Sequence, residues 1–248
     1  MLHNIDLEAI KDIAFLAGEE VMRIYRRDFK VYEKADRSPL SEADIVANRI
    51  ICESLTHFSL PLLSEENKHI PFSERKGWEY FFMIDPIDGT KEFIKKNGEF
   101  TINIALIHKH TPVLGVVYAP AIGIMYSAKS GYGAFKNNLP LPLNKTESNV
   151  YTIVASKSHM SEETRAFIDS INTNKSKNLI SMGSSLKLCL VASGQADIYP
   201  RLAPTMEWDT AAADAIVREA GKMCYDFSTK KPLVYNKKNL ENPYFVVE

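Results

Sequence analysis

Residues 80–94 read YFFMIDPIDGTKEFI, and the interpretation of the whole chain begins with this stretch. The five apolar residues from Tyr80 to Ile84 have the length and character of a buried strand. We expect this strand to end at Asp85, and a second acid, Asp88, follows three positions later. Burial of apolar side chains is favourable, whereas a carboxylate beside a buried strand needs a partner. The stretch therefore raises the question of what the two acids bind.

The residues between and after the two acids predict a stiff turn. Pro86 fixes its own backbone and biases Asp85 toward an extended conformation, and Gly89 permits a tight turn afterwards. Such a turn would direct both carboxylates and the main-chain carbonyl of Ile87 to one point. An oxygen-only site of this kind suits Mg²⁺ better than zinc. The alternative is an ordinary turn in which Asp85 and Asp88 accept local backbone hydrogen bonds.

Further acids stand at the ends of predicted elements. Glu65 and Glu66 follow a short apolar strand, Asp209 lies at the start of a helix, and Asp44 follows Ser41 at capping-box spacing. Each has a simpler interpretation as a solvated strand end, a first-turn acid or a helix cap. Taken together, they place several carboxylates where alternating strands and helices usually form their sites. Because like charges repel unless cations join them, the set favours a site for several Mg²⁺ ions.

Composition limits the classes of function. The 248 residues include 30 Lys and Arg against 31 Asp and Glu, a net charge of -1 that gives no basic surplus for nucleic acid. No apolar run reaches the length of a membrane-spanning helix, and the first residues do not resemble a signal peptide. Cys52, Cys189 and Cys224 form no CxxC pair and are expected to be free thiols. These observations predict a cytoplasmic protein.

The order of the predicted elements suggests two subdomains. Apolar spacing predicts helices over residues 5–26 and from about residue 41 to 55, followed by antiparallel strands between 100 and 135. After residue 150, predicted strands and helices alternate, at 150–156, 161–171, 178–183, 184–194, 196–200 and 208–221, the last ending at a Gly221 cap. We expect an α+β metal-binding subdomain over 1–140 and an α/β substrate-binding subdomain over 141–248.

At this point the motifs resemble a known family. DPIDGT at 85–90, the acid pair at 65–66 and WDTAAADAIVREAG at 208–221 are similar to the lithium-sensitive, Mg²⁺-dependent phosphatases of the inositol monophosphatase superfamily. Within it, SPLSEAD at 38–44 and GSSLKLCLVASGQADIYPR at 183–201 resemble the bacterial 3′(2′),5′-bisphosphate nucleotidases, with Leu-Ser at 40–41 where Val-Thr is common. The resemblance implies an α/β fold, a layered αβαβα sandwich of the inositol monophosphatase and fructose-1,6-bisphosphatase type.

The resemblance also implies a role for each acid. Two to three Mg²⁺ ions would be held by oxygen ligands from Glu65, Asp85, Ile87, Asp88 and Asp209. Asp85 would bridge two ions, one shared with Glu65 and the Ile87 carbonyl and the other with Asp88 and Asp209. Glu65 would also contact a third, weakly held ion through water.

Catalysis would depend on two further residues. Thr90 would orient the attacking water, and Asp44 would polarise the Thr90 hydroxyl. The main-chain amides around Gly89 and Thr90 would face the phosphate. The resemblance also implies that six of these residues contact the substrate: Glu65, Ile87, Asp88, Gly89, Thr90 and Asp209.

The segment 183–201 is expected to select the substrate. A nucleoside 3′,5′-bisphosphate needs cations for its uncleaved phosphate, and Lys187 and Arg201 are the candidates. Ser184 and Ser185 could contact ribose or phosphate oxygens. Inositol-specific relatives usually carry small apolar residues at the positions of Ser184, Ser185 and Lys187. The alternatives are a solvated Lys187 and a helix-capping Ser184. Three other polar residues are interpreted as ordinary loop or surface residues: Lys34, Arg37 and His159.

The expected activity is Mg²⁺-dependent hydrolysis of adenosine 3′,5′-bisphosphate to AMP and phosphate, which the resemblance connects with sulfate assimilation and inhibition by Li⁺. An inositol monophosphatase or broad sugar-phosphate phosphatase is the alternative enzyme. A non-catalytic nucleotide-binding protein is the alternative of another class, but Thr90 and Asp44 are both present. We expect a monomer rather than a dimer. Some bacterial relatives associate peripherally with the inner membrane, although no amphipathic anchor stands out here.

Overall fold

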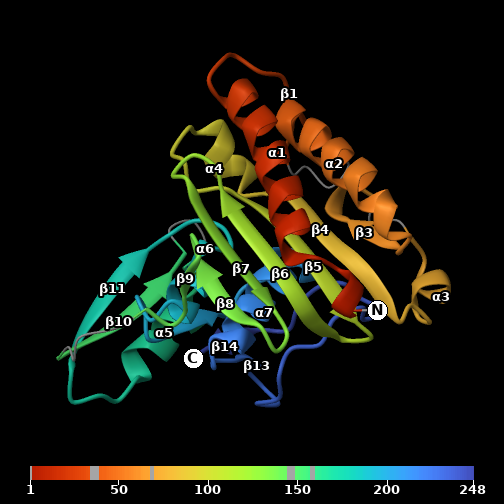
Figure 1. Ribbon diagram of the computed structural model, residues 1–248. Helices are drawn as coiled ribbons and strands as arrows, with labels where there is room; N and C mark the ends of the chain where they lie inside the picture. The colour runs from red at the N-terminus through yellow and green to blue at the C-terminus, as the bar shows by residue number, and fades with distance from the viewer. Residues whose placement is uncertain (1, 34–38, 68–69, 144–148, 157–159) are drawn as a thin grey trace.

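A seven-stranded sheet forms the centre of the molecule (Figure 1). The structure is a computed structural model that describes residues 2–33, 39–67, 70–143, 149–156 and 160–248. In sheet order, the strands are β3 (Leu62–Ser64), β4 (Tyr80–Asp88), β5 (Thr101–His108), β6 (Thr111–Ala119), β7 (Ile124–Lys129), β8 (Gly133–Lys136) and β9 (Leu139–Pro140). β3 and β4 run parallel, and every later neighbour is antiparallel.

Helices cover both faces of this sheet. Figure 1 shows α1 (Leu7–Tyr25) and α2 (Glu42–Leu55) side by side on one face, while α6 (Leu186–Ala192) and α7 (Glu207–Glu219) lie on the other. The alternation of side chains along β4 explains the arrangement. Phe82 and Ile84 belong to the apolar core under α1 and α2, whereas Phe81 and Met83 belong to the core under α7. Because β4 is covered on both faces, its apolar run is continuous.

A second group of strands lies beyond α6 and α7. It comprises β10 (Val150–Ala155), β11 (Ser176–Ser181), β12 (Tyr199–Arg201), β13 (Cys224–Asp226) and β14 (Phe245–Val247). β10 pairs with β11, β14 lies between β12 and β13, and a bridge from Ile153 to Ile198 joins the two sets. α5 (Glu162–Ser170) buries Ile168 against this group. The resulting succession of helix, sheet, helix, sheet and helix layers confirms the predicted αβαβα sandwich.

The remaining elements are short. They are β1 (Val31–Glu33), β2 (Pro39–Ser41), α3 (Phe72–Arg75), α4 (Thr90–Ile94) and the 3₁₀ turns η1 (Leu2–Asn4), η2 (Thr56–Phe58) and η3 (Glu65–Asn67). All three cysteines are free thiols, as predicted. Among the residues described, no helix is both long enough and apolar enough to cross a membrane.

The structure corrects three sequence predictions. β4 does not end at Ile84 but continues to Asp88, with a register shift between its pairs at Asp85 and Asp88, because Pro86 has no N–H to continue the ladder. The helix predicted from residue 184 begins only at Leu186. β13 and β14 are not among the predicted strands, since their three-residue lengths give no recognisable period.

The close approach of α7 to the central sheet depends on Gly115 in β6. A Cβ atom at this position would lie 2.0 Å from the main-chain oxygen of Ala212, so any larger residue would push α7 away. α7 then runs to the predicted stop, where Gly221 has a φ of 79° after the last helical turn. This packing sets the position of the first turn of α7, which carries Asp209.

Candidate functional site

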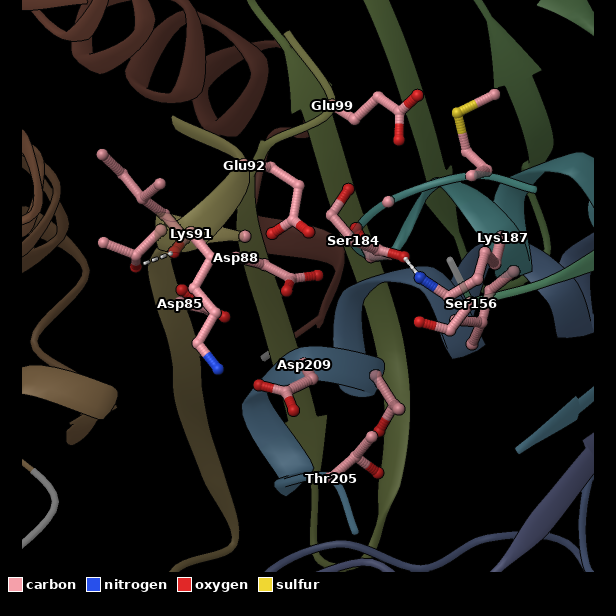
Figure 2. Close-up of a pocket in the computed structure, with 18 of the residues that line it drawn as sticks. Asp85, Asp88, Lys91, Glu92, Glu99, Ser156, Ser184, Lys187, Thr205 and Asp209 are labelled. Carbon is pink, nitrogen blue, oxygen red and sulfur yellow. Dashed lines mark hydrogen bonds between the residues drawn. The ribbon is translucent and has the colours of Figure 1, made fainter. Parts of the chain in front are cut away.

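A cavity of about 510 Å³ opens where the end of β4, the start of α4, the start of α6 and the first turn of α7 converge. Every residue predicted to contact a metal ion or the substrate lines it: Glu65, Asp85, Ile87, Asp88, Gly89, Thr90, Ser184, Lys187, Arg201 and Asp209. Figure 2 shows Asp85 and Asp88 on one side, Ser184 and Lys187 across from them, and Asp209 below. The sequence prediction of one shared site is consistent with this placement, while the role of each residue stays a prediction.

Three carboxylates gather at the floor of the cavity. Asp85, Asp88 and Asp209 each offer an oxygen, and these oxygens lie within 4.8 Å of one another. β4 supplies the first two, and α7 supplies the third from its first turn. Asp85 is 1% exposed, and its Oδ1 atom accepts no hydrogen bond from any described residue. A buried carboxylate oxygen without a donor is a suitable ligand for a cation.

The electrostatics of the cluster also favour a bound cation. Burial raises the pKa of Asp85 well above its usual value, and the nearby charges of Glu65 and Asp88 raise it further. Burial also raises the pKa of Asp88 to about 6 and that of Asp209 to about 8. These carboxylates therefore resist ionising together without a cation. Hard oxygen ligands under mutual repulsion fit a divalent ion such as Mg²⁺.

Asp209 has two roles that the sequence presented as alternatives. Its Oδ2 atom accepts a 2.9 Å hydrogen bond from the Met206 main-chain N–H, as expected for an acid in the first helical turn. The same side chain also belongs to the carboxylate cluster. The capping bond fixes the carboxylate while its other oxygen stays available to the cavity.

Thr90 and Asp44 form a polar pair behind the carboxylate cluster. The Thr90 hydroxyl lies 3.1 Å from Asp44 Oδ1 and 3.3 Å from the Ile87 carbonyl oxygen, both as acceptors. Asp44 is itself held by Ser41, whose main-chain N–H and hydroxyl both donate to Asp44 Oδ2, which confirms the predicted capping box. Burial raises the pKa of Asp44 to about 6, so it remains an acceptor at neutral pH.

Two cationic side chains lie across the cavity from the acids. Lys187 is buried, donates to the Ser184 main-chain oxygen at 2.5 Å and lies over the ring of Tyr199. Burial lowers its pKa to about 8, and the charge of Asp88 opposes that shift. Because Lys187 is buried, the alternative of a solvated Lys187 is wrong.

Arg201 is the second cation. It donates to the Pro204 carbonyl, and its buried Nε has no acceptor in the described part of the chain.

Ser184 adopts an unusual backbone conformation immediately before α6. Its φ is 48°, a left-handed value that is costly for a residue with a side chain. Its hydroxyl oxygen is buried and has no partner among the residues described. Ser185, not Ser184, occupies the cap position, and Ser185 makes no capping hydrogen bond. The alternative of a capping Ser184 is therefore also wrong.

The cavity includes residues that sequence reasoning missed: Lys91, Glu92, Glu99, Ser156 and Thr205. Ser185, which the sequence did single out, also lines it. Figure 2 shows the Glu92 carboxylate near Asp88. Lys91 and Glu92 directly follow the DPIDGT motif, so their position on the first turn of α4 was a usable signal. Glu99 and Thr205 follow no comparable local pattern. Lys34, Arg37 and His159 lie outside the described residues.

Comparisons with known proteins identify the family to which the chain is similar. The model of the inositol monophosphatase family matches residues 4–244, which confirms the predicted resemblance. The chain is 40% identical over 248 residues to the 3′(2′),5′-bisphosphate nucleotidase CysQ of Escherichia coli (strain K12), covering 97% of this chain and 98% of that protein. It is 36% identical to the CysQ nucleotidase of Haemophilus influenzae, covering 95% and 89% of the two chains.

A solved structure matches nearly the whole chain. The crystal structure of CysQ from Bacteroides thetaiotaomicron, a bacterial member of the inositol monophosphatase family, matches with a TM-score of 0.90 and 43% sequence identity. The match covers 98% of this chain and 96% of that one. The similarity therefore extends over both sheets and all the elements that surround the cavity.

Proposed function

This chain belongs to the inositol monophosphatase family, and we propose that it is a Mg²⁺-dependent 3′(2′),5′-bisphosphate nucleotidase. Its substrate is adenosine 3′,5′-bisphosphate, which it hydrolyses to AMP and phosphate. Near full-length similarity to curated nucleotidases supports this substrate class. The observation that carries the proposal is a single cavity with a carboxylate cluster on one side and the Lys187–Arg201 pair on the other.

The carboxylate cluster would hold the metal ions. Glu65, Asp85, Asp88, Asp209 and the main-chain carbonyl of Ile87 would supply the oxygen ligands for two to three Mg²⁺ ions. When bound, the ions would lower the pKa of the attacking water and neutralise the leaving oxygen.

Thr90 and Asp44 would orient the attacking water. A hydroxyl has one proton, and donation to Asp44 leaves the Thr90 oxygen free to accept a hydrogen bond from water. That bond would turn a lone pair of the water toward phosphorus. The new bond joins the water oxygen to phosphorus, the bond from phosphorus to the ribose 3′ oxygen breaks, and a proton passes to that ribose oxygen.

The uncleaved 5′-phosphate would bind on the opposite side of the cavity. Lys187, Arg201 and Ser184 supply donors there, and two of these donor groups are buried without partners in the described chain. A phosphate would satisfy them with charge-assisted hydrogen bonds. Inositol monophosphate has no second phosphate for this position, so the arrangement favours the bisphosphate.

The two halves of the chain would divide these tasks. Residues 1–140 would supply most of the metal ligands, and residues 141–248 would supply the substrate contacts together with Asp209. We expect one chain to contain a complete site and to act as a monomer, which light scattering of the active protein can test.

The deciding experiment compares phosphate release from adenosine 3′,5′-bisphosphate and inositol 1-phosphate with Mg²⁺, with and without Li⁺. We expect kcat/KM to favour the nucleotide by about a hundredfold or more, roughly 2.7 kcal/mol of transition-state discrimination. Li⁺ is expected to inhibit both reactions. Comparable or reversed values would support a broad phosphatase instead. Binding of the nucleotide without phosphate release would support the non-catalytic alternative.

A further inference from the structure

We propose that Ser185 is a positioning residue that connects the start of α6 to the strand pair carrying the metal-binding acids. Its hydroxyl orients Asn103, the cross-strand neighbour of Asp85. This role rests on the proposed function, because it concerns the geometry of the same carboxylate cluster.

The hydroxyl of Ser185 lies in a buried chain of hydrogen bonds. Its Oγ atom is 2.8 Å from Thr101 Oγ1 and donates to Asn103 Oδ1 at 2.9 Å. All three side chains are at most 1% exposed, so water does not compete for these bonds. Each hydroxyl has one proton, and donation by Ser185 to Asn103 leaves Thr101 as the donor to Ser185. The chain therefore runs in one direction, from Thr101 through Ser185 to Asn103.

The register of the sheet places this chain directly beside the acids. Thr101 is the cross-strand partner of Asp88, and Asn103 is the partner of Asp85. Side chains of such partners share one face of the sheet, with Cβ atoms about 5 Å apart. The two residues that contact Ser185 are thus the neighbours of the two acids on β4.

The bond to Asn103 determines which edge of its amide remains available. Ser185 occupies Oδ1, and Nδ2 is buried without a partner in the described chain. Asp85 Oδ1 is likewise buried without one. With Ser185 in place, the donor edge of the Asn103 amide is therefore the one left unpaired beside the strand that carries Asp85. Without that hydroxyl, the amide can rotate and present its oxygen, which would repel the Asp85 carboxylate.

The main chain of Ser185 also lies near the acids. Its N–H interacts with the Asp88 carboxylate in the direction that lowers the pKa of Asp88, against the stronger effect of burial. Bonds from surrounding residues to ligating carboxylates fix their orientation, and their loss typically costs about 10–100-fold in metal affinity or activity. Ser185 therefore acts on the metal site, while Lys187 and Arg201 contact the substrate.

The test compares Ser185→Ala with Ser193→Ala. Ser193 is also a buried serine at an end of α6, but its hydroxyl donates to the Leu190 carbonyl and the Gln195 side chain, and it does not line the cavity. Binding of Mg²⁺ alone is measured by calorimetry on both variants, together with kcat and KM for adenosine 3′,5′-bisphosphate. The melting temperature without metal reports any general loss of stability.

We expect Ser185→Ala to weaken Mg²⁺ binding about tenfold and to lower kcat about 10–100-fold, with KM changed less than about threefold. Ser193→Ala should leave all three values near those of the unchanged protein, with a similar melting temperature. Mg²⁺ affinity and kcat within about twofold in both variants would overturn the proposal.

Thr101→Val provides a second, independent test, and it applies even if Ser185→Ala folds poorly. It removes the first donor of the chain and should reproduce the same effects in weaker form. In the double variant, the second substitution should add little, because residues of one hydrogen-bond network are not additive. Full additivity would contradict the relay. If the unchanged protein fails to hydrolyse the bisphosphate, the proposed substrate is wrong, while Mg²⁺ calorimetry still decides the role of Ser185.

Discussion

The end of β4 and the start of α6 face each other across one cavity, but they position their functional atoms differently. At the end of β4, strand register and the left-handed turn at Gly89 place the acids. At the start of α6, Ser184 is held in a left-handed conformation, with its carbonyl bound by Lys187. Strand register and a glycine turn therefore place the acids, whereas a left-handed non-glycine residue and the Lys187 hydrogen bond to its carbonyl place the cationic side.

The pKa values on the two sides of the cavity are shifted in opposite directions. The carboxylates repel one another, and burial together with their mutual charge raises the pKa values of Asp85, Asp88 and Asp209. Across the cavity, burial lowers the pKa of Lys187, while Asp88 partly balances its charge. Cations relieve the first side and an anion relieves the second. A phosphate ester bound with metal ions would relieve both together.

Substitution of Asp85 by Asn should give the largest effect, because this residue is the most buried acid of the cluster and its Oδ1 atom has no other partner in the described chain. Loss of several kcal/mol of charge stabilisation, about 4 kcal/mol, should lower kcat/KM for adenosine 3′,5′-bisphosphate roughly a thousandfold. Without metal, the variant should instead gain about 1 kcal/mol or more in unfolding free energy, because the raised pKa of the buried Asp85 carboxyl destabilises the fold at neutral pH and Asn does not ionise. Steady-state kinetics and chemical denaturation measure the two effects.

The matched control is Asp169→Asn, which removes an equally charged but exposed aspartate from α5. It should change neither kcat/KM nor stability measurably. An Asp85→Asn variant that keeps more than a tenth of the activity would contradict the assignment of Asp85 as a metal ligand.

Thr90 offers a sharper test of the acidic side, because two substitutions separate its hydroxyl from its shape. Thr90→Val should lower kcat about a hundredfold, as expected for a group that orients the attacking water, with little change in KM. Thr90→Ser keeps the hydroxyl and its acceptors Asp44 and Ile87, so it should keep most of the activity. A loss in Thr90→Ser as large as that in Thr90→Val would contradict a role that depends on the hydroxyl alone.

Sequence reasoning succeeded best on the acidic side. Acids that follow apolar strands, together with a Pro and a Gly at fixed spacing, predict the cluster of Asp85, Asp88 and Asp209 because strand and helix ends meet at sheet edges. The layered fold followed from the family resemblance. The exact course of β4 did not, since a shift of register inside DPID leaves no periodic signal.

The cationic side was harder to predict. Burial of Lys187 depends on packing against Tyr199, which lies twelve residues away along the chain. The sequence contains two adjacent serines, yet only the left-handed turn at Ser184 sends one hydroxyl to the cavity and the other to β5. That division requires a three-dimensional contact between α6 and Thr101 and Asn103, 84 and 82 residues apart from Ser185.

The pH dependence of metal stabilisation extends the comparison to the folded state. An acid whose pKa is higher in the folded protein than its unfolded value near 4 binds more protons when folded. The metal-free protein should therefore lose stability as pH rises from about 4 through the pKa of Asp209 at about 8. Mg²⁺ replaces these protons. At pH 8 and a hundred times its dissociation constant, Mg²⁺ should stabilise the fold by about 2.7 kcal/mol, or roughly 5–10 °C in Tm.

Differential scanning calorimetry at pH 5 and pH 8, with and without a fixed concentration of Mg²⁺, measures this effect. The shift in Tm should be clearly smaller at pH 5, where protons compete for the same oxygens. Asp85→Asn should lose most of the shift at pH 8. A Mg²⁺-induced shift that is equal at both pH values would separate metal binding from the carboxylate cluster.

The smallest expected effect belongs to the cationic side. Arg201 lies partly exposed, so replacement by Met should cost about 1.5 kcal/mol of charge-assisted hydrogen bonding, roughly tenfold in kcat/KM. The loss should fall mainly on KM, and only for substrates with a second phosphate. Adenosine 3′-monophosphate lacks that phosphate and should be hydrolysed equally well by both proteins. Because the acids at the end of β4 are unchanged, Mg²⁺ affinity should also stay the same. A tenfold loss on both nucleotides would show instead that Arg201 supports the cavity as a whole, and the distinction between a metal side and a substrate side would fail at this residue.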